Sequence, residues 1–268
     1  MMRIATLLLL VVILPLGGCL KPLPNDPQLL AQFQQRPQNL RLEFTTEQGR
    51  QVAYYLPPLQ NPDAPPQRIA ILYPGINSLA LGWLRFINLE DYPNTAYLLI
   101  DYPGRGLSAG VMRPEENYRN SLGALKALAE HFGVTQLSAS LRLLGHSFGT
   151  GAALQFACLR PAERVVLVAP FNDLKQAVRR QSWLLSLLMP SQIDNRLLIR
   201  QLLAEPQPPR IIILHGGRDT TLPIAMGREL AQLDPEKIVF HAFAEDDHVD
   251  ILSRRRKLIF QELNGQVE

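Results

Sequence analysis

A serine between two glycines stands where the sequence pattern changes from strand to helix. The pentapeptide Gly-His-Ser-Phe-Gly at residues 145–149 follows a short apolar run, residues 141–144, and opens a helical pattern that continues to residue 159. A Gly-x-Ser-x-Gly turn of this kind holds the serine in a strained backbone conformation, and its glycines let the strand and the helix approach closely. The sequence therefore predicts that the hydroxyl of Ser147 projects from the edge of a sheet as a nucleophile.

Ser147 needs a base, because a serine hydroxyl is a weak nucleophile until a neighbouring group accepts its proton. Among the five histidines, only His248 lies in a loop after the last predicted strand, so it is the predicted base. The base needs an acid that fixes its tautomer, and Asp219 follows the predicted strand at 211–214. Asp173, which follows an earlier strand, is the alternative acid. A surface histidine in an acidic loop is the alternative interpretation of His248.

Strand and helix patterns alternate around these residues. Residues 40–44 and 51–56 alternate apolar and polar side chains and form a predicted β-hairpin. Further strands are predicted at residues 69–73, 96–100, 141–144, 165–168, 211–214 and 238–243, and helices at 115–131, 148–159, 223–233 and 250–263. Strands that alternate with helices form a parallel sheet covered on both faces. We therefore expect an α/β fold with one mostly parallel central sheet.

The length of 268 residues allows one sizeable α/β domain, which we predict over residues 40–268. Between about 171 and 210 the alternation breaks, and two helical patterns separated by Pro190 predict an inserted lid. The first of these patterns is strongly apolar around Trp183. An apolar lid favours acyl chains as substrate, and ordinary packing of a lid onto its domain explains the pattern equally well.

The N-terminus has the pattern of an exported lipoprotein. One positive charge and an apolar run up to residue 16 are typical of a signal peptide and are too short for a stable membrane anchor. The run ends in Leu-Gly-Gly-Cys, which resembles the lipobox of bacterial lipoproteins and predicts cleavage after residue 18 and a diacylglycerol on Cys19. An ordinary signal peptide with a chance cysteine is the alternative. Residues 19–39 are rich in proline, glutamine and asparagine and are predicted to form a tether, with one short helix at most.

Composition and charge point to no nucleic-acid partner and no cofactor. The net charge of +3 comes from scattered residues, apart from a basic run at 254–257 that we interpret as the solvated face of a terminal helix. The sequence has no histidine pair at helical spacing and no cysteine cluster, so no metal is expected. Cys158, the other cysteine, is predicted to be a buried thiol.

Residues 68–263 resemble the α/β-hydrolase superfamily, especially its small lidded esterase, lysophospholipase and serine-aminopeptidase-like branch. The positions of Ser147, Asp219 and His248 match its catalytic triad in order, and residues 101–108, Asp-Tyr-Pro-Gly-Arg-Gly-Leu-Ser, look like its glycine-rich loop beside the active site. The resemblance implies an α/β-hydrolase fold with helices on both faces of the sheet and a short helical lid. It also implies a serine mechanism through an acyl-enzyme, which needs no cofactor.

Such a mechanism needs two backbone N–H groups that bind the oxyanion of the tetrahedral intermediate. The first is expected from Phe148, which follows the nucleophile at the start of the helix. The second is expected from the loop after strand 69–73, where Ile76 is the first choice and Asn77 the next. Pro74 in this loop departs from the His-Gly pair that is common in the superfamily.

These expectations describe a hydrolase of a small-molecule or lipid carboxylic ester or thioester. Its N-terminal lipid would tether it to a membrane of the bacterial cell envelope, the outer membrane facing the periplasm if the bacterium is Gram-negative. A serine peptidase is an alternative of the same acyl-transfer chemistry. A catalytically silent binding or scaffold lipoprotein of the same fold is an alternative of a different class.

Overall fold

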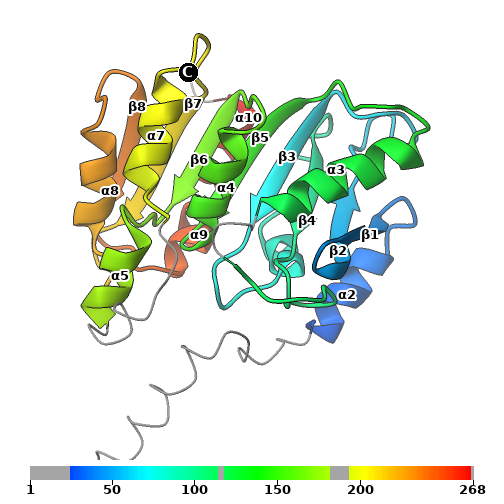
Figure 1. Cartoon of the computed structure of the whole chain (residues 1–268), viewed down its shortest axis with the longest axis horizontal. Helices are drawn as coiled ribbons and strands as arrows, with labels where there is room; N and C mark the ends of the chain where they lie inside the picture. The colour runs from blue at the N-terminus through cyan, green and yellow to red at the C-terminus, as the bar shows by residue number, and fades with distance from the viewer. Residues whose placement is uncertain (1–24, 114–117, 182–192, 267–268) are drawn as a thin grey trace, which may run out of the picture.

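Eight strands form one sheet in the order β1-β2-β4-β3-β5-β6-β7-β8 (Figure 1). The structure is a computed structural model that describes residues 25–113, 118–181 and 193–266. The strands are β1 (Leu40–Thr46), β2 (Gly49–Leu56), β3 (Arg68–Tyr73), β4 (Ala96–Ile100), β5 (Ser140–His146), β6 (Arg164–Val168), β7 (Arg210–Gly216) and β8 (Ile238–Phe243). Strand β2 is antiparallel to both of its neighbours, and β4, β3, β5, β6, β7 and β8 are parallel.

Helices cover both faces of the sheet, because the central strands are apolar on both sides. The helical elements are α2 (Pro27–Gln34), η1 (Ala80–Arg85), α3 (Arg119–His131), α4 (Gly149–Ala157), α5 (Leu174–Gln181), α7 (Asn195–Leu203), α8 (Ile224–Ala231), α9 (Asp250–Arg254) and α10 (Arg256–Asn264). Helices α3, α4, α7 and α8 pack on one face, in front of the sheet in Figure 1. Elements α2, η1, α9 and α10 pack on the other face. Because β4, β3, β5, β6, β7 and β8 are parallel, their carboxyl ends lie at one common edge of the sheet.

The α/β-hydrolase fold predicted from the sequence is confirmed by this architecture. The predicted hairpin corresponds to β1 and β2, which pair with Thr46 opposite Gly49. The predicted last helix, residues 250–263, is instead two helices, since the chain breaks at Arg255. The 3₁₀-helix η1 was not predicted. The predicted signal peptide, Cys19 and the apolar part of the lid at residues 183–189 lie outside the described residues.

The described part of the predicted tether lies on the domain. Helix α2 begins at Asp26, whose carboxylate accepts the N–H of Gln28, as is typical of an N-cap. Phe33 is buried and its ring meets that of Tyr54 edge to face at 5.2 Å. A second buried side chain, Leu29, packs beside it. The one short helix that the sequence allowed here is present, and the packing of its apolar face was not predicted: residues 27–34 lie against the folded domain.

Helix α7 belongs to the layer that covers the sheet, although its residues fall within the predicted lid. Ile199 and Leu202 are buried in the same cluster as α4. Asp194 caps α7 by accepting the N–H groups of Arg196 and Leu197. Helix α5, also within the predicted lid, lies near the carboxyl edge of the sheet (Figure 1), and its Leu174 and Ala177 are buried in the same cluster.

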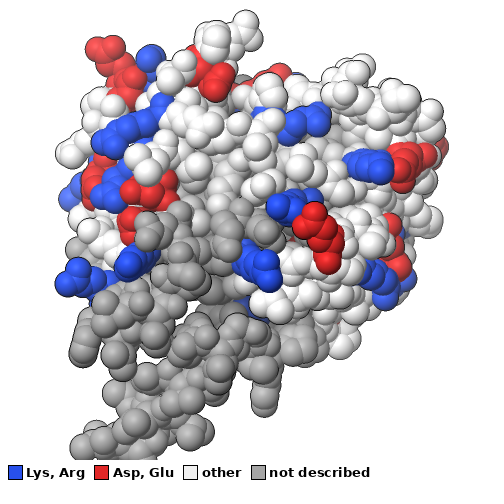
Figure 2. Space-filling model, in the orientation of Figure 1, with Lys and Arg blue, Asp and Glu red and all other residues white. Residues whose placement is uncertain are grey.

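Charged residues of both signs are interspersed on the surface. On the face shown in Figure 2, basic and acidic side chains lie beside each other and leave a broad uncharged area between them. In the basic run, Arg255 pairs with Asp246 at 2.6 Å and Arg256 pairs with Asp91 at 3.0 Å. Two of its guanidinium groups are therefore neutralised by carboxylates of the same chain. Within residues 25–113, 118–181 and 193–266, no helix has the length and hydropathy needed to cross a membrane.

Candidate active site

Ser147 lies in a strained turn between β5 and α4. Its φ of 54° is in the left-handed region, which residues with a side chain rarely adopt. A Cβ added at Gly145 would lie 2.4 Å from the carbonyl oxygen of Gly149, and one added at Gly149 would lie 2.3 Å from that of Tyr73. Both glycines are therefore required by close backbone approach. The turn predicted from the Gly-x-Ser-x-Gly pattern is present with the strain that the pattern implies.

His248 connects Ser147 to Asp219 in one hydrogen-bonded relay. Ser147 Oγ lies 2.9 Å from His248 Nε2, and His248 Nδ1 lies 2.7 Å from Asp219 Oδ2. With its Nδ1–H donated to the carboxylate, the imidazole presents the Nε2 lone pair to the serine hydroxyl. Asp219 follows β7 and His248 follows β8, so three residues from separate parts of the chain meet at the carboxyl edge of the sheet.

The Asp219 carboxylate is fully buried and has hydrogen-bond donors on both oxygens. Its Oδ1 accepts the N–H groups of Thr221 at 2.9 Å and Leu222 at 2.7 Å. Burial raises its pKa, but hydrogen bonds from His215, His248 and the Leu222 N–H outweigh burial and hold the pKa well below the ordinary value. Asp219 is therefore ionised at neutral pH, as an acid that orients an imidazole must be.

His215 is a second histidine beside the same carboxylate. Its Nε2 lies 2.8 Å from the carbonyl oxygen of Leu222 and 3.3 Å from Asp219 Oδ2, and its side chain is fully buried. Since only an N–H can bond the carbonyl, Nε2 carries the proton and is shared between the two oxygens. A Cβ at Gly227 would lie 2.5 Å from His215 Nδ1, so this glycine makes room for the ring. His215 directly follows the predicted strand at 211–214, and the sequence did not indicate this contact.

His146 holds the backbone of the predicted base. Its Nε2 lies 2.8 Å from the carbonyl oxygen of His248, and the two rings are 5.1 Å apart. Burial, with His248 close by, lowers the pKa of His146 to about 4. The ring is therefore neutral at neutral pH and donates from Nε2 to the carbonyl. His146, at the first variable position of the Gly-x-Ser-x-Gly pattern, therefore holds the loop that carries His248 in place.

The predicted oxyanion donors flank Ser147. Among the described residues, the backbone N–H groups of Phe148 and Ile76 have no hydrogen-bond acceptor. A Cβ added at Gly75 would lie 3.6 Å from the Cβ of Ser147, so the loop after β3 reaches the serine directly. Two free donors on either side of a nucleophile are what a developing oxyanion needs.

The glycine-rich loop at residues 101–108 fixes the oxyanion loop. Tyr102 Oη donates to the carbonyl oxygen of Pro74 at 2.7 Å, and the Arg105 guanidinium donates to that of Ile76 at 2.8 Å. The Arg105 bond orients the peptide that carries the Asn77 N–H, and the Ser78 N–H, which donates to the Gly75 carbonyl at 3.0 Å, orients the peptide that carries the Ile76 N–H. The sequence predicted that this loop lies beside the active site, but not that Tyr102 and Arg105 bond the peptides on either side of the one that carries the Ile76 N–H.

Asp101, at the start of this loop, is buried with one unsatisfied oxygen. Its Oδ1 accepts the N–H of Ala80 at 2.8 Å, and its Oδ2 has no partner among the described residues. Burial raises its pKa to about 6, against the opposing effects of the Ala80 N–H and of Arg105. The folded protein therefore binds the Asp101 proton more tightly than the unfolded chain does. The free energy of unfolding falls as the pH rises from the unfolded pKa near 3.8 to about 6.

Asp101→Asn is expected to raise the melting temperature by several degrees at pH 8 and to change it little at pH 4. The amide keeps an acceptor for Ala80 and removes a buried charge that costs about 3 kcal/mol at the higher pH, at 1.4 kcal/mol per pKa unit. Thermal unfolding of both proteins at the two pH values measures the effect. Asp63→Asn, an exposed position, is the control. A stabilisation of equal size at pH 4 and pH 8 would contradict this account of Asp101.

The other acidic candidates make different contacts. Asp173, the alternative acid, accepts the N–H of Gln176 at 2.7 Å and lies 3.5 Å from the Arg196 guanidinium. Asp246, in the acidic loop before His248, has a fully buried side chain paired with Arg255. Burial of this pair anchors the loop that carries His248. The geometry around the imidazole therefore favours Asp219 over every other carboxylate of the described residues.

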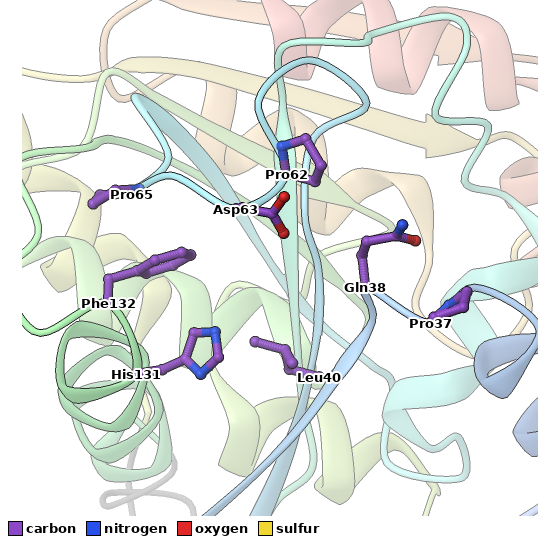
Figure 3. A pocket seen from close by; sticks show the side chains of 8 residues that line it. All are labelled: Pro37, Gln38, Leu40, Pro62, Asp63, Pro65, His131 and Phe132. Carbon is purple, nitrogen blue, oxygen red and sulfur yellow. The ribbon is translucent and has the colours of Figure 1, made fainter.

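A groove of about 460 Å³ lies at the opposite edge of the sheet, near the start of β1 and the end of α3 (Figure 3). Its lining residues are Pro37, Gln38, Leu40, Pro62, Asp63, Pro65, His131 and Phe132. None of the relay residues contributes to it. The described part of the chain holds no group of three or more His, Cys, Asp or Glu side chains that could bind a metal ion.

Comparisons with known proteins agree with this architecture. Among solved structures, an esterase from Pyrococcus furiosus superposes with a TM-score of 0.66 at 15% identity, covering 91% of this chain and 97% of that one. The 2,6-dihydroxy-pseudo-oxynicotine hydrolase gives 0.65 at 18% identity, covering 90% and 72%. The esterase domain of a Rhodothermus marinus protein gives 0.61 at 19% identity, covering 85% and 97%. At these identities the likeness shows the fold.

Sequence comparison identifies the family. A search of curated protein sequences found no match. The family described as serine aminopeptidase, S33, matches residues 65–210, which is more than half of the chain and includes the turn at Ser147. The match ends before Asp219 and His248, so the relay beyond Ser147 is an observation of the structure alone. On the evidence of this match and of the fold, the chain belongs to the serine aminopeptidase, S33, family of the α/β-hydrolase superfamily.

Proposed function

We propose that the protein hydrolyses a carboxylic ester or thioester through an acyl-enzyme on Ser147. The relay from Ser147 Oγ through His248 to the buried Asp219 carboxylate is the observation that carries this proposal. In the first step, Ser147 Oγ bonds to the substrate carbonyl carbon while its proton passes to His248 Nε2. The imidazolium then gives that proton to the departing alcohol or thiol, which leaves the acyl group on the serine. A water molecule reverses these transfers and releases the acid.

The oxyanion formed in each half of the reaction is expected to accept hydrogen bonds from the N–H groups of Phe148 and Ile76. Asn77 is the alternative second donor. Loss of one such donor typically costs about 3 kcal/mol of transition-state stabilisation. Support comes from the two N–H groups without an acceptor and from the Ser78 N–H, whose bond to the Gly75 carbonyl orients the peptide that carries the Ile76 N–H. The Arg105 bond to the Ile76 carbonyl orients the Asn77 N–H in the same way.

A serine peptidase is the second candidate, and the family description favours it. Peptide and ester hydrolysis use the same steps, but an amide leaving group needs full protonation before it departs. The two candidates differ in substrate, so one experiment can compare them.

Labelling with a fluorophosphonate probe tests the mechanism, and a substrate panel tests the class. The wild-type protein is expected to be labelled at Ser147 and to hydrolyse p-nitrophenyl esters graded from acetate to palmitate. An aminoacyl p-nitroanilide panel is the peptidase arm. A higher kcat/KM on the anilides than on the esters would replace the ester proposal by the peptidase one, and absence of labelling would contradict both.

We also propose that the protein is a lipoprotein of a bacterial envelope membrane, anchored by a diacylglycerol on Cys19. The support is the order of apolar run, small residues and cysteine at residues 4–19. Cys19→Ser is expected to leave an uncleaved precursor without lipid, seen by intact mass after membrane extraction. Cys158→Ser is the matched control, since it leaves the N-terminus intact. A mature wild-type chain without a lipid adduct would contradict the proposal.

A further inference from the structure

The first described residue, Asn25, is held beside the loops of the active site. Its side-chain amide lies 3.0 Å from Tyr54 Oη. Its Oδ1 would lie 3.5 Å from a Cβ added at Gly106, in the glycine-rich loop. The next residue in the chain, Asp26, pairs with Arg85 at 2.7 Å. The chain therefore enters the fold at the carboxyl edge of the sheet, close to the loop that fixes the oxyanion donors.

Large apolar side chains are exposed on loops at this same edge. We call them the apolar rim, and they are Ile76, Leu107, Val111 and Val249, with exposures of 36%, 43%, 40% and 65%. They lie on three loops that surround the relay, and exposed apolar groups gathered around a site mark a surface that binds another apolar surface. The other exposed large apolar residues, Leu59, Leu122, Leu159 and Leu197, lie on other elements.

Contacts between these loops connect the rim to Asn25 and to the relay. Gly106, beside Asn25, precedes Leu107 in the chain. Arg105 bonds the carbonyl oxygen of Ile76, as described above. Val249 directly follows His248. The Asp247 carboxylate accepts the Val249 N–H at 2.8 Å, so the negative charge of Asp247 lies at the start of α9. The rim thus runs around the relay from the point where the chain enters the fold.

The proposed anchor lies within short reach of that point. Asn25 is the sixth residue after Cys19, and six residue steps span at most about 21 Å whatever their conformation. A domain of about 240 residues has a radius of gyration of about 18 Å, hence a diameter of about 45 Å. An anchor this short holds Asn25 near the membrane surface, and the loop that carries Leu107 lies beside Asn25.

We propose that the bilayer that holds the lipid of Cys19 also covers the apolar rim, so that the active site opens onto the lipid surface. This inference rests on the proposed lipidation and deepens the proposed function, because it makes the substrate an ester presented by that membrane. The acyl chain of such a substrate passes from lipid to Ser147 without crossing bulk water. Burial of four exposed apolar side chains would add to the membrane affinity that the two acyl chains of the diacylglycerol supply.

Depth-dependent quenching tests this orientation. The full lipidated chain carrying Cys158→Ala receives one cysteine at a time, Leu107→Cys or Val111→Cys on the rim and Leu59→Cys or Leu159→Cys as controls. Each cysteine is labelled with an environment-sensitive fluorophore in phosphatidylethanolamine and phosphatidylglycerol vesicles that contain doxyl-labelled lipid. Quenching is expected to be at least threefold stronger at both rim positions than at both controls.

Three results would overturn the inference. They are equal quenching at all four positions, stronger quenching at the controls, and failure of the Cys19 chain to remain with the vesicles on flotation. Fluorophosphonate labelling of each variant checks that Ser147 is reactive and the fold intact. Loss of labelling in the wild-type chain would contradict the proposed hydrolase while the quenching pattern still reports the orientation, so the two failures are distinguishable.

Discussion

Ser147→Ala is expected to lower kcat about a millionfold on any ester that the wild-type protein hydrolyses, and His248→Ala by a similar factor. Without Oγ no acyl-enzyme forms, and without the imidazole at 2.9 Å nothing accepts the serine proton. The double variant is expected to lose little more than either single one, because the residues act as a unit and their effects are not additive. Steady-state kinetics at substrate saturation measure all three.

A serine and a histidine outside the relay serve as controls for this experiment. Ser253→Ala alters an exposed hydroxyl on α9, and His131→Ala alters an exposed histidine at the end of α3. Both are expected to keep wild-type kcat. Full activity in Ser147→Ala would show that another group is the nucleophile. If the loss of kcat in the double variant equalled the product of the two single losses, Ser147 and His248 would not act in the same step.

Asp219→Asn is expected to lower kcat about ten-thousandfold while the protein remains folded. The amide can still accept the N–H groups of Thr221 and Leu222, so the turn after β7 is retained. Its NH₂ group facing His248 Nδ1 favours the tautomer with the proton on Nε2, which cannot accept a proton from the serine. Kinetics together with thermal unfolding separate this effect from loss of structure.

Asp173→Asn is the matched comparison, since both aspartates follow strands at the same sheet edge. The carboxylate of Asp173 contacts Gln176 and Arg196 and makes no hydrogen bond to His248. Its replacement is expected to leave kcat within about tenfold of wild type. If Asp173→Asn were the damaging change and Asp219→Asn the mild one, the acid would be misassigned while the serine mechanism stood.

The sequence predicted those parts of the structure that depend on local pattern. Strands β4 and β8 have the predicted bounds, because apolar runs of this length between turn residues have few other structures open to them. The relay residues were found because the turn at Ser147 has a local backbone signature and the order of the other two was implied by the family resemblance. Helix α2 was underestimated because four prolines nearby masked its short apolar face.

The supporting contacts of the site depend on tertiary packing, and so the sequence did not reveal them. His215 looked like a strand residue, and only the folded chain brings its Nε2 to Leu222 and Asp219. Arg105 lies in a loop whose glycines were recognised, but its partner, the Ile76 carbonyl, is 29 residues away in the chain. A signal was present at Gly227, where a glycine within a helix indicates close packing, here against the His215 ring.

The order of the relay residues along the chain also determines when the protein becomes a hydrolase during its synthesis. Ser147 precedes His248 by 101 residues, which at about 5–20 residues per second is roughly 5–20 s of translation. For that interval the nascent chain carries a serine with no base, and the turn that strains it has no neighbouring β7 or β8. Every fragment that ends before residue 248 is therefore inert toward esters, so premature termination or early proteolysis releases no active hydrolase into the compartment that makes the chain.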